Sequence, residues 1–133
     1  MTNSTIWTDS GNKVALNRLF KATPDYLAPS LIKVGDGTTT ATALDTDLDS
    51  AVELTAGVSY ASFSSGYPTL DESNLQVTIR SFINSLQANG ENLTEFGIFN
   101  SDSSKLMVSR TVHTVIAKTS SIEVSYVEKN ILA

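Results

Sequence analysis

Two ionisable residues stand out because each interrupts an otherwise apolar strand pattern. Glu95 lies in the segment LTEFGIF, and Arg110 lies in LMVSRTVHTVIA. A carboxylate in such a position could act as a general acid or base, bind a ligand, or serve as a structural charge. A turn near Asp102 would make the two strands antiparallel neighbours and bring both charges together. We therefore predict that Glu95 is a structural charge satisfied by Arg110 or Arg80.

A catalytic role for Glu95 requires a second carboxylate. Glu72 or Asp71 could supply it in a glycosidase-like pair, but no aromatic-lined sugar site is evident around these acids. His113 is the only histidine, so a catalytic triad with a spare base or a multi-histidine metal site cannot be assembled from ordinary partners. Strand alternation instead predicts that His113 lies on a sheet surface. The sequence favours a protein without catalytic, metal or cofactor residues.

Three aspartates at alternate positions resemble the start of a calcium loop. Asp45, Asp47 and Asp49 occupy positions one, three and five of such a loop. The sixth position requires glycine and holds Ser50, and the twelfth requires a bidentate acid and holds Ala56. We therefore predict a solvated loop that caps the start of a helix.

The segment VGDGTTT, residues 34–40, suggests a turn. Gly35 and Gly37 are the turn residues, because glycine adopts the positive φ that other residues resist. A phosphate-binding loop would place lysine directly after its last glycine, where this chain has Thr38. The sequence therefore predicts no phosphate site here.

Composition excludes several classes of partner. The 133 residues indicate one domain, and 9 Lys and Arg against 14 Asp and Glu give a net charge of −5, which is the wrong sign for binding nucleic acid. No apolar run is long enough to span a membrane, and the first residues do not resemble a secretory signal. The chain has no cysteine, so it must fold without disulfides.

The N-terminal region predicts a docking arm. Apolar side chains within residues 14–20 are spaced for about two turns of helix, and the two prolines of KATPDYLAPS then favour extended chain. We assign residues 1–30 to an extended arm that presents Trp7, Leu16 and Phe20 to another subunit. The alternative is that this segment packs on its own domain.

The remaining residues, 31–133, predict a mainly β domain. The clearest strand alternation lies in LQVTIRSFINSL, and four strands linked by polar turns occupy roughly residues 75–132 as a meander. A short strand at 31–34 and a strand pattern at 58–67 precede them, with one or two helical turns at 46–53. Such strands must bury one face each, so we predict a small antiparallel β-sandwich with one or two short helices.

Several short motifs resemble a set of tailed-bacteriophage virion proteins, namely tail-fibre, tail-collar and baseplate-associated modules. The shared pattern is a Gly-x-Gly-Thr turn, a Thr-x-Leu segment, Glu-x-Gly-x-Phe and Leu-x-x-x-Arg. It spans about residues 31–128, and its matching positions are Gly35, Gly37, Thr38, Thr46, Leu48, Glu95, Gly97, Phe99, Leu106 and Arg110.

The resemblance implies a non-enzymatic β-sandwich that attaches virion proteins to one another. The expected partners are other virion proteins and further copies of the same chain. The expected location is the particle, in the tail or on its surface, after synthesis in the host cytoplasm. In this interpretation Glu95, Gly97, Phe99, Arg110 and the two turn glycines are structural. A capsid decoration protein and a small glycan-binding or glycan-cleaving module are the alternatives.

Overall fold

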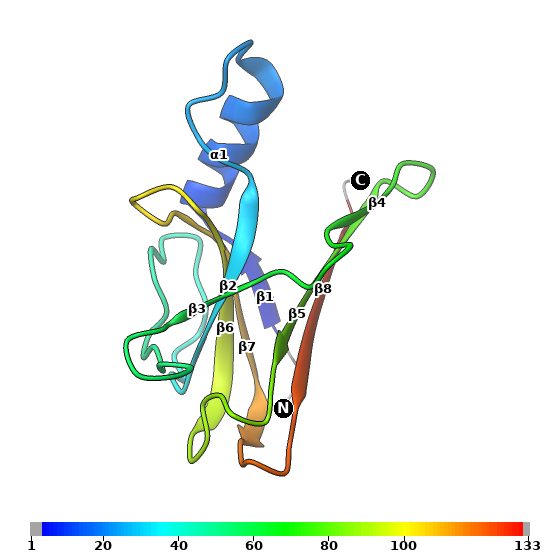
Figure 1. Ribbon diagram of the computed structural model, residues 1–133. Coiled ribbons are helices and arrows are strands. Elements are labelled where there is room, and N and C mark those ends of the chain that lie inside the picture. Colours follow the sequence, from blue (N-terminus) through cyan, green and yellow to red (C-terminus); the bar gives the residue numbers. More distant parts are fainter. Residues whose placement is uncertain (1–3, 132–133) are drawn as a thin grey trace.

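The computed structural model describes residues 4–131 as one helix and eight strands (Figure 1). The elements in chain order are β1 (Ser4–Trp7), α1 (Asp9–Phe20), β2 (Pro29–Gly35), β3 (Tyr60–Ser62), β4 (Thr69–Asp71), β5 (Gln76–Ile83), β6 (Asn92–Asn100), β7 (Met107–Ala117) and β8 (Val124–Ile131).

Two antiparallel sheets form the body of the molecule, which confirms the predicted mainly β sandwich. The larger sheet has the strand order β1-β7-β6-β2-β3, and the smaller sheet has the order β4-β5-β8. The main core lies between them and combines side chains such as Ile32 and Ile98 from the larger sheet with Ile83 and Tyr126 from the smaller one. Burial of these apolar faces is the main force that holds the two sheets together.

The predicted meander is wrong, although all four of its strands exist. β6 and β7 form a hairpin through the predicted turn near Asp102, but β5 pairs along its full length with β8 and not with β6. The chain therefore crosses between the sheets at residues 84–91 and again at 118–123. Gly90 has the positive φ expected of a turn residue, yet its turn belongs to the first crossover and not to a hairpin.

The two crossovers are fastened to each other by Lys118. Its side chain is 1% exposed, and its Nζ donates to Asn89 Oδ1 at 2.8 Å and to the Thr119 carbonyl at 3.0 Å. Backbone hydrogen bonds join Gly90 and Glu91 to Lys118 at the same place. This junction closes one end of the sandwich.

The N-terminal segment is not a free arm. β1 pairs with β7 as an edge strand of the larger sheet, and Trp7 packs against the main core. Thr8 caps α1 by accepting a hydrogen bond from the Gly11 N–H, which satisfies one of the free donors of the first turn. The division at residue 30 also falls inside β2. α1 and the residues that follow it extend away from one end of the larger sheet (Figure 1).

The helix predicted at 46–53 is also absent. Residues 36–59 form a long covering loop, whose first part lies on the face of the larger sheet that points away from the smaller one (Figure 1). Val52 and Leu54 in its second part belong to the main core. Leu48 in this loop packs on Phe99 and Met107, which form a second small core. Among the described residues, no helix is long and apolar enough to cross a membrane.

Candidate functional site

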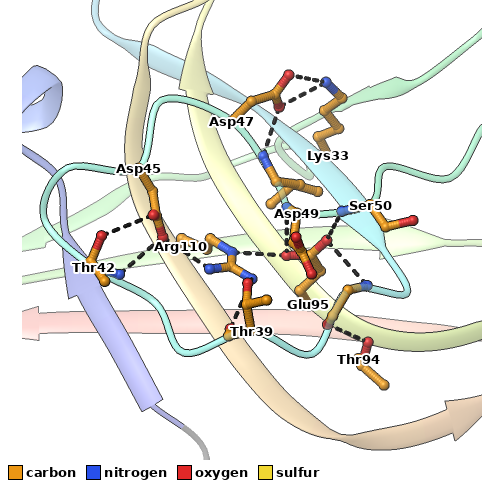
Figure 2. Close-up of polar contacts among 12 residues, drawn as sticks. Lys33, Thr39, Thr42, Asp45, Asp47, Asp49, Ser50, Thr94, Glu95 and Arg110 are labelled. Carbon is orange, nitrogen blue, oxygen red and sulfur yellow. Dashed lines mark hydrogen bonds and ion pairs between the residues drawn. The ribbon is translucent and has the colours of Figure 1, made fainter.

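Glu95 lies beneath the covering loop and is fully buried. Its strand, β6, is central in the larger sheet, so its side chain points directly at the loop that covers the outer face. Oε1 accepts the backbone N–H groups of Ser50 at 2.8 Å and Gly37 at 3.2 Å, and Oε2 accepts that of Asp49 at 3.2 Å. The carboxylate thus replaces water for three backbone donors of one loop (Figure 2).

Arg110 supplies the fourth hydrogen bond to Glu95. Its Nε donates to Glu95 Oε2 at 2.8 Å, which confirms the predicted contact between the two charges. Register explains it, because Glu95 lies opposite Val112, and Gly97 lies opposite Arg110, on the paired strands β6 and β7. Arg80, the other predicted partner, instead donates to Ser125 in the smaller sheet.

The remaining donors of Arg110 also bind the covering loop. Nη1 donates to Asp45 Oδ2 at 2.9 Å, and Nη2 donates to the Thr39 carbonyl at 3.0 Å. Burial alone would lower the pKa of Arg110, but its hydrogen bonds to Asp45 and Glu95 outweigh that effect and raise it. Burial likewise opposes ionisation of Asp45, yet hydrogen bonds from Thr42 and Arg110 hold its pKa below the usual value. The guanidinium is therefore fixed and charged.

Gly35 and Gly37 make room for the Glu95 carboxylate. A Cβ at Gly35 would lie 2.3 Å from the Ser50 carbonyl oxygen, and a Cβ at Gly37 would lie 2.6 Å from Glu95 Oε1. Neither glycine is among the residues with positive φ, so the predicted reason, turn conformation, is wrong. Close approach of the loop to the buried charge is what requires glycine at both positions.

Gly97, two residues after Glu95 on β6, also makes room for neighbouring side chains. A Cβ there would lie 2.9 Å from the Phe99 ring and 3.2 Å from a Leu48 methyl group. The absence of a side chain therefore lets Leu48, Phe99 and Met107 form the second core beneath the loop. The residues predicted to be structural therefore lie together beneath the covering loop.

The three alternating aspartates do not converge. Asp45 pairs with Arg110, and Asp47 pairs with Lys33 at 2.9 Å, while Asp49 takes part through its backbone N–H. Within residues 4–131 no group of three or more histidine or acidic side chains is placed to hold a metal ion. The loop capped by these acids leads into no helix.

The second carboxylate proposed for a catalytic pair lies elsewhere. Asp71 ends β4 in the smaller sheet and accepts hydrogen bonds from Asn74 in the adjoining turn, and Glu72 is exposed in that turn. Glu95 lies on the outer face of the other sheet. The structure therefore does not bring these acids together.

His113 is buried, so the prediction of a surface histidine is wrong. The ring is 5% exposed because β7 turns it inward, where its Nε2 lies 3.0 Å from the Tyr126 hydroxyl and Nδ1 lies 2.8 Å from the Thr114 carbonyl. Burial lowers the pKa of His113. Burial also raises the pKa of Tyr126. Both groups are uncharged at neutral pH.

The predicted docking residues separate into two groups. Trp7 is half-buried in the sandwich, and its Nε1 donates to Asn130 Oδ1 at 3.0 Å. Leu16 and Phe20 on α1 are 60% and 78% exposed, and Leu19 between them is 73% exposed. An open surface groove of about 650 Å³ runs beside this helix, with Leu16, Phe20 and Tyr26 in its lining together with polar residues of the helix.

Lys118 and Glu128 are buried ionisable residues that the sequence interpretation missed. Lys118 offered no signal, because its partners lie on a crossover that local patterns do not reveal. The sequence did contain a signal for the burial of Glu128. Alternation in VSYVEKN places it on the same face as Val124 and Tyr126, and both of these are core residues.

No family model matches this chain in comparisons with known proteins, and neither a curated protein nor a solved structure matches it.

Proposed function

We propose that this protein is a non-enzymatic structural protein of a tailed-bacteriophage particle, where it attaches one tail protein to another as a fibre, collar or baseplate adaptor. The sequence motifs described above motivate this proposal. The observation that carries the attachment function is the exposed apolar face of α1, which projects beyond both sheets (Figure 1). Its partners would be other virion proteins and further copies of this chain.

The exposed face is suited to binding a protein. Leu16, Leu19 and Phe20 are spaced three and four residues apart, so they share one side of the helix. The polar side of α1 is already occupied, because Asn17 and Lys21 both bind Asp25 in the loop that follows. Contiguous apolar surface on a projecting element commonly marks a protein interface.

The geometry of Glu95 supports a non-enzymatic function. A general acid or base must reach a substrate proton, but this carboxylate is fully buried and already accepts four hydrogen bonds from the protein. Its observed partners hold the covering loop on the sheet. We therefore propose that Glu95 and Arg110 keep the sandwich rigid as a body from which α1 projects.

Particle incorporation tests the proposal. A triple variant with Leu16→Ser, Leu19→Ser and Phe20→Ser should keep the unfolding free energy of the wild type, since these side chains are exposed, yet be absent from purified particles by mass spectrometry. A matched control carries Leu44→Ser and Leu86→Ser, which are 80% and 78% exposed on other surfaces. The control should be incorporated normally.

The possible failures of this experiment are distinguishable. Absence of the wild-type protein from particles would refute the virion assignment. Normal incorporation of the triple variant would refute attachment through α1. Cross-linking to a head protein would favour a capsid decoration protein. Turnover of host polysaccharide that is lost on Glu95→Gln would refute the non-enzymatic assignment.

A further inference from the structure

A second cavity lies between the two sheets, on the opposite face of the larger sheet from the polar site beneath the covering loop. It has a volume of about 150 Å³, and most of its walls are apolar. Both sheets contribute to it, with Trp7 and Val108 from the larger sheet and Val77 and Ile79 from the smaller one, while Phe63 follows β3. A cavity of about this volume can hold a molecule the size of benzene.

One wall of this cavity carries a buried carboxylate. Glu128 on β8 is 6% exposed, and its oxygens accept hydrogen bonds from Ser109 Oγ at 3.0 and 3.2 Å and from Asn130 Nδ2 at 3.0 Å. Asn130 in turn accepts from the Trp7 indole N–H at 3.0 Å. This chain of hydrogen bonds fixes the carboxylate and the indole ring relative to each other on the cavity wall.

Glu128 takes part in no ion pair among the described residues. Among residues 4–131 the ion pairs join Lys21 to Asp25, Lys33 to Asp47, and Arg110 to both Asp45 and Glu95, and none includes Glu128. A carboxylate can accept about four hydrogen bonds, so two neutral donors leave acceptor capacity unused. Burial raises the pKa of Glu128, as expected for an acid without a neighbouring cation.

These features define the chemistry of a ligand. A primary ammonium would supply the missing positive charge and donate to the free acceptor sites of Glu128. An aromatic ring such as that of Trp7 also attracts a cation placed over its face. A short hydrocarbon tail on the same ligand would contact the apolar walls formed by residues such as Val77, Ile79 and Val108.

We propose that the inter-sheet cavity is a binding site for a small organic ammonium ion with a short apolar substituent, held by Glu128 and Trp7. This site is independent of the attachment function proposed for α1. A neutral molecule of the same shape would bind less tightly, because it leaves the buried carboxylate without a counter-charge.

The only tryptophan of the chain lies on the cavity wall and gives a direct measurement. We would titrate the full-length protein with n-butylammonium chloride and follow the indole N–H resonance of Trp7, with sodium chloride as the ionic-strength control. The neutral comparison is 1-butanol, which has the same number of heavy atoms. The expected result is saturable binding of butylammonium in the millimolar range, at least about tenfold tighter than that of butanol.

Two variants separate the carboxylate from the cavity. Glu128→Gln keeps the shape and the hydrogen bonds to Ser109 and Asn130, and it should abolish the preference for the ammonium while butanol still binds. Ala28→Leu fills the rim of the cavity and should weaken binding of both probes with Glu128 intact. Glu123→Gln, an exposed position on the adjoining turn, is the matched control and should change neither affinity.

Each possible outcome decides the proposal. Preference for butylammonium that disappears in Glu128→Gln and persists in Glu123→Gln supports it. No saturable change at Trp7, equal affinity for the two probes, or a preference that survives in Glu128→Gln would overturn it. If Glu128→Gln does not fold, Ala28→Leu still decides, because unchanged ammonium binding in that variant would place the ligand outside the cavity.

Discussion

Glu95 and Glu128 are both buried glutamates on strands of the same sandwich, but their surroundings are opposite. Glu95 is 0% exposed and is bound by a guanidinium and three backbone N–H groups, whereas Glu128 is 6% exposed and is bound only by a hydroxyl and an amide. The first carboxylate is satisfied by the protein, and the second has no cationic partner among residues 4–131. Burial alone therefore does not show whether an acid has a structural role. The charge of the neighbouring groups distinguishes the two cases.

The largest change in the free energy of unfolding should come from removal of the cation beside Glu95. Arg110→Met leaves a buried carboxylate without its counter-charge, so we expect the free energy of unfolding to fall by about 3 to 5 kcal/mol. Urea denaturation measures this change. Arg80→Met is the matched control, because the described hydrogen bond of the Arg80 side chain goes to Ser125 in the other sheet, and its loss should cost about 1 kcal/mol. Equal losses in both variants would refute the special role of Arg110.

Replacement of the Glu95 carboxylate should lower the free energy of unfolding somewhat less than replacement of Arg110. In Glu95→Gln the amide nitrogen faces N–H donors, but Arg110 retains its bond to Asp45, so we expect a loss of about 2 to 3 kcal/mol. Glu72→Gln, at an exposed turn, is the control and should leave stability unchanged within error. An unaltered unfolding transition in Glu95→Gln would contradict the structural role.

Crowding the space around Glu95 should release the covering loop. The Cβ of Gly37→Ala would overlap the Glu95 carboxylate and Asp49, so we expect a loss of about 1 to 3 kcal/mol and faster hydrogen exchange at the Ser50 amide. Gly57→Ala provides the comparison, because Gly57 has a φ of +76° with open space around it. It should lose about 1 kcal/mol through backbone strain without faster exchange at Ser50.

The smallest effect should come from Glu128. Glu128→Gln replaces a buried acid that is in no ion pair among residues 4–131, so at neutral pH we expect stability to be equal to that of the wild type or higher by about 1 kcal/mol. An acid whose pKa is raised by folding binds protons more tightly in the folded state. The wild type should therefore lose stability as the pH rises above 4.5, the ordinary value for this group, and the variant should lack this loss.

Denaturation curves of both proteins between acidic and neutral pH measure this difference. Asp45 contributes the opposite slope, because its lowered pKa adds stability that is lost as the pH falls through its folded value. That contribution is common to the wild type and to Glu128→Gln, so it cancels in their difference. A difference that shrinks with rising pH would contradict the raised pKa of Glu128.

Local patterns predicted the parts of this structure that depend on neighbours in sequence. Alternation and a short turn were sufficient for the β6–β7 hairpin, and so for the contact between Glu95 and Arg110. Strand alternation also predicts the inward position of Glu128. It does not predict that Ser109 from the other sheet lies opposite Glu128. Charge pairs within a hairpin are readable from one sequence, whereas contacts across the sandwich depend on which sheets each strand joins.

The glycines show the second limit of the sequence. Gly35 and Gly37 are recognisable as special positions, but a glycine that gives a turn and a glycine that gives space look identical in sequence. Their function became clear only when the covering loop was placed over Glu95. The predicted helix at 46–53 failed for a related reason, because the backbone N–H groups of Asp49 and Ser50 bind Glu95 and not helical carbonyls.

The pairing of β5 with β8 has a consequence for the folding kinetics. Gln76 lies opposite Ile131, so closing the smaller sheet must bring together two strands that have the whole β6–β7 hairpin between them in sequence. Structures rich in such distant pairings fold slowly, in about milliseconds to seconds. We therefore expect the amides of β6 and β7 to gain protection early in refolding, and those of β5 and β8 to gain it last.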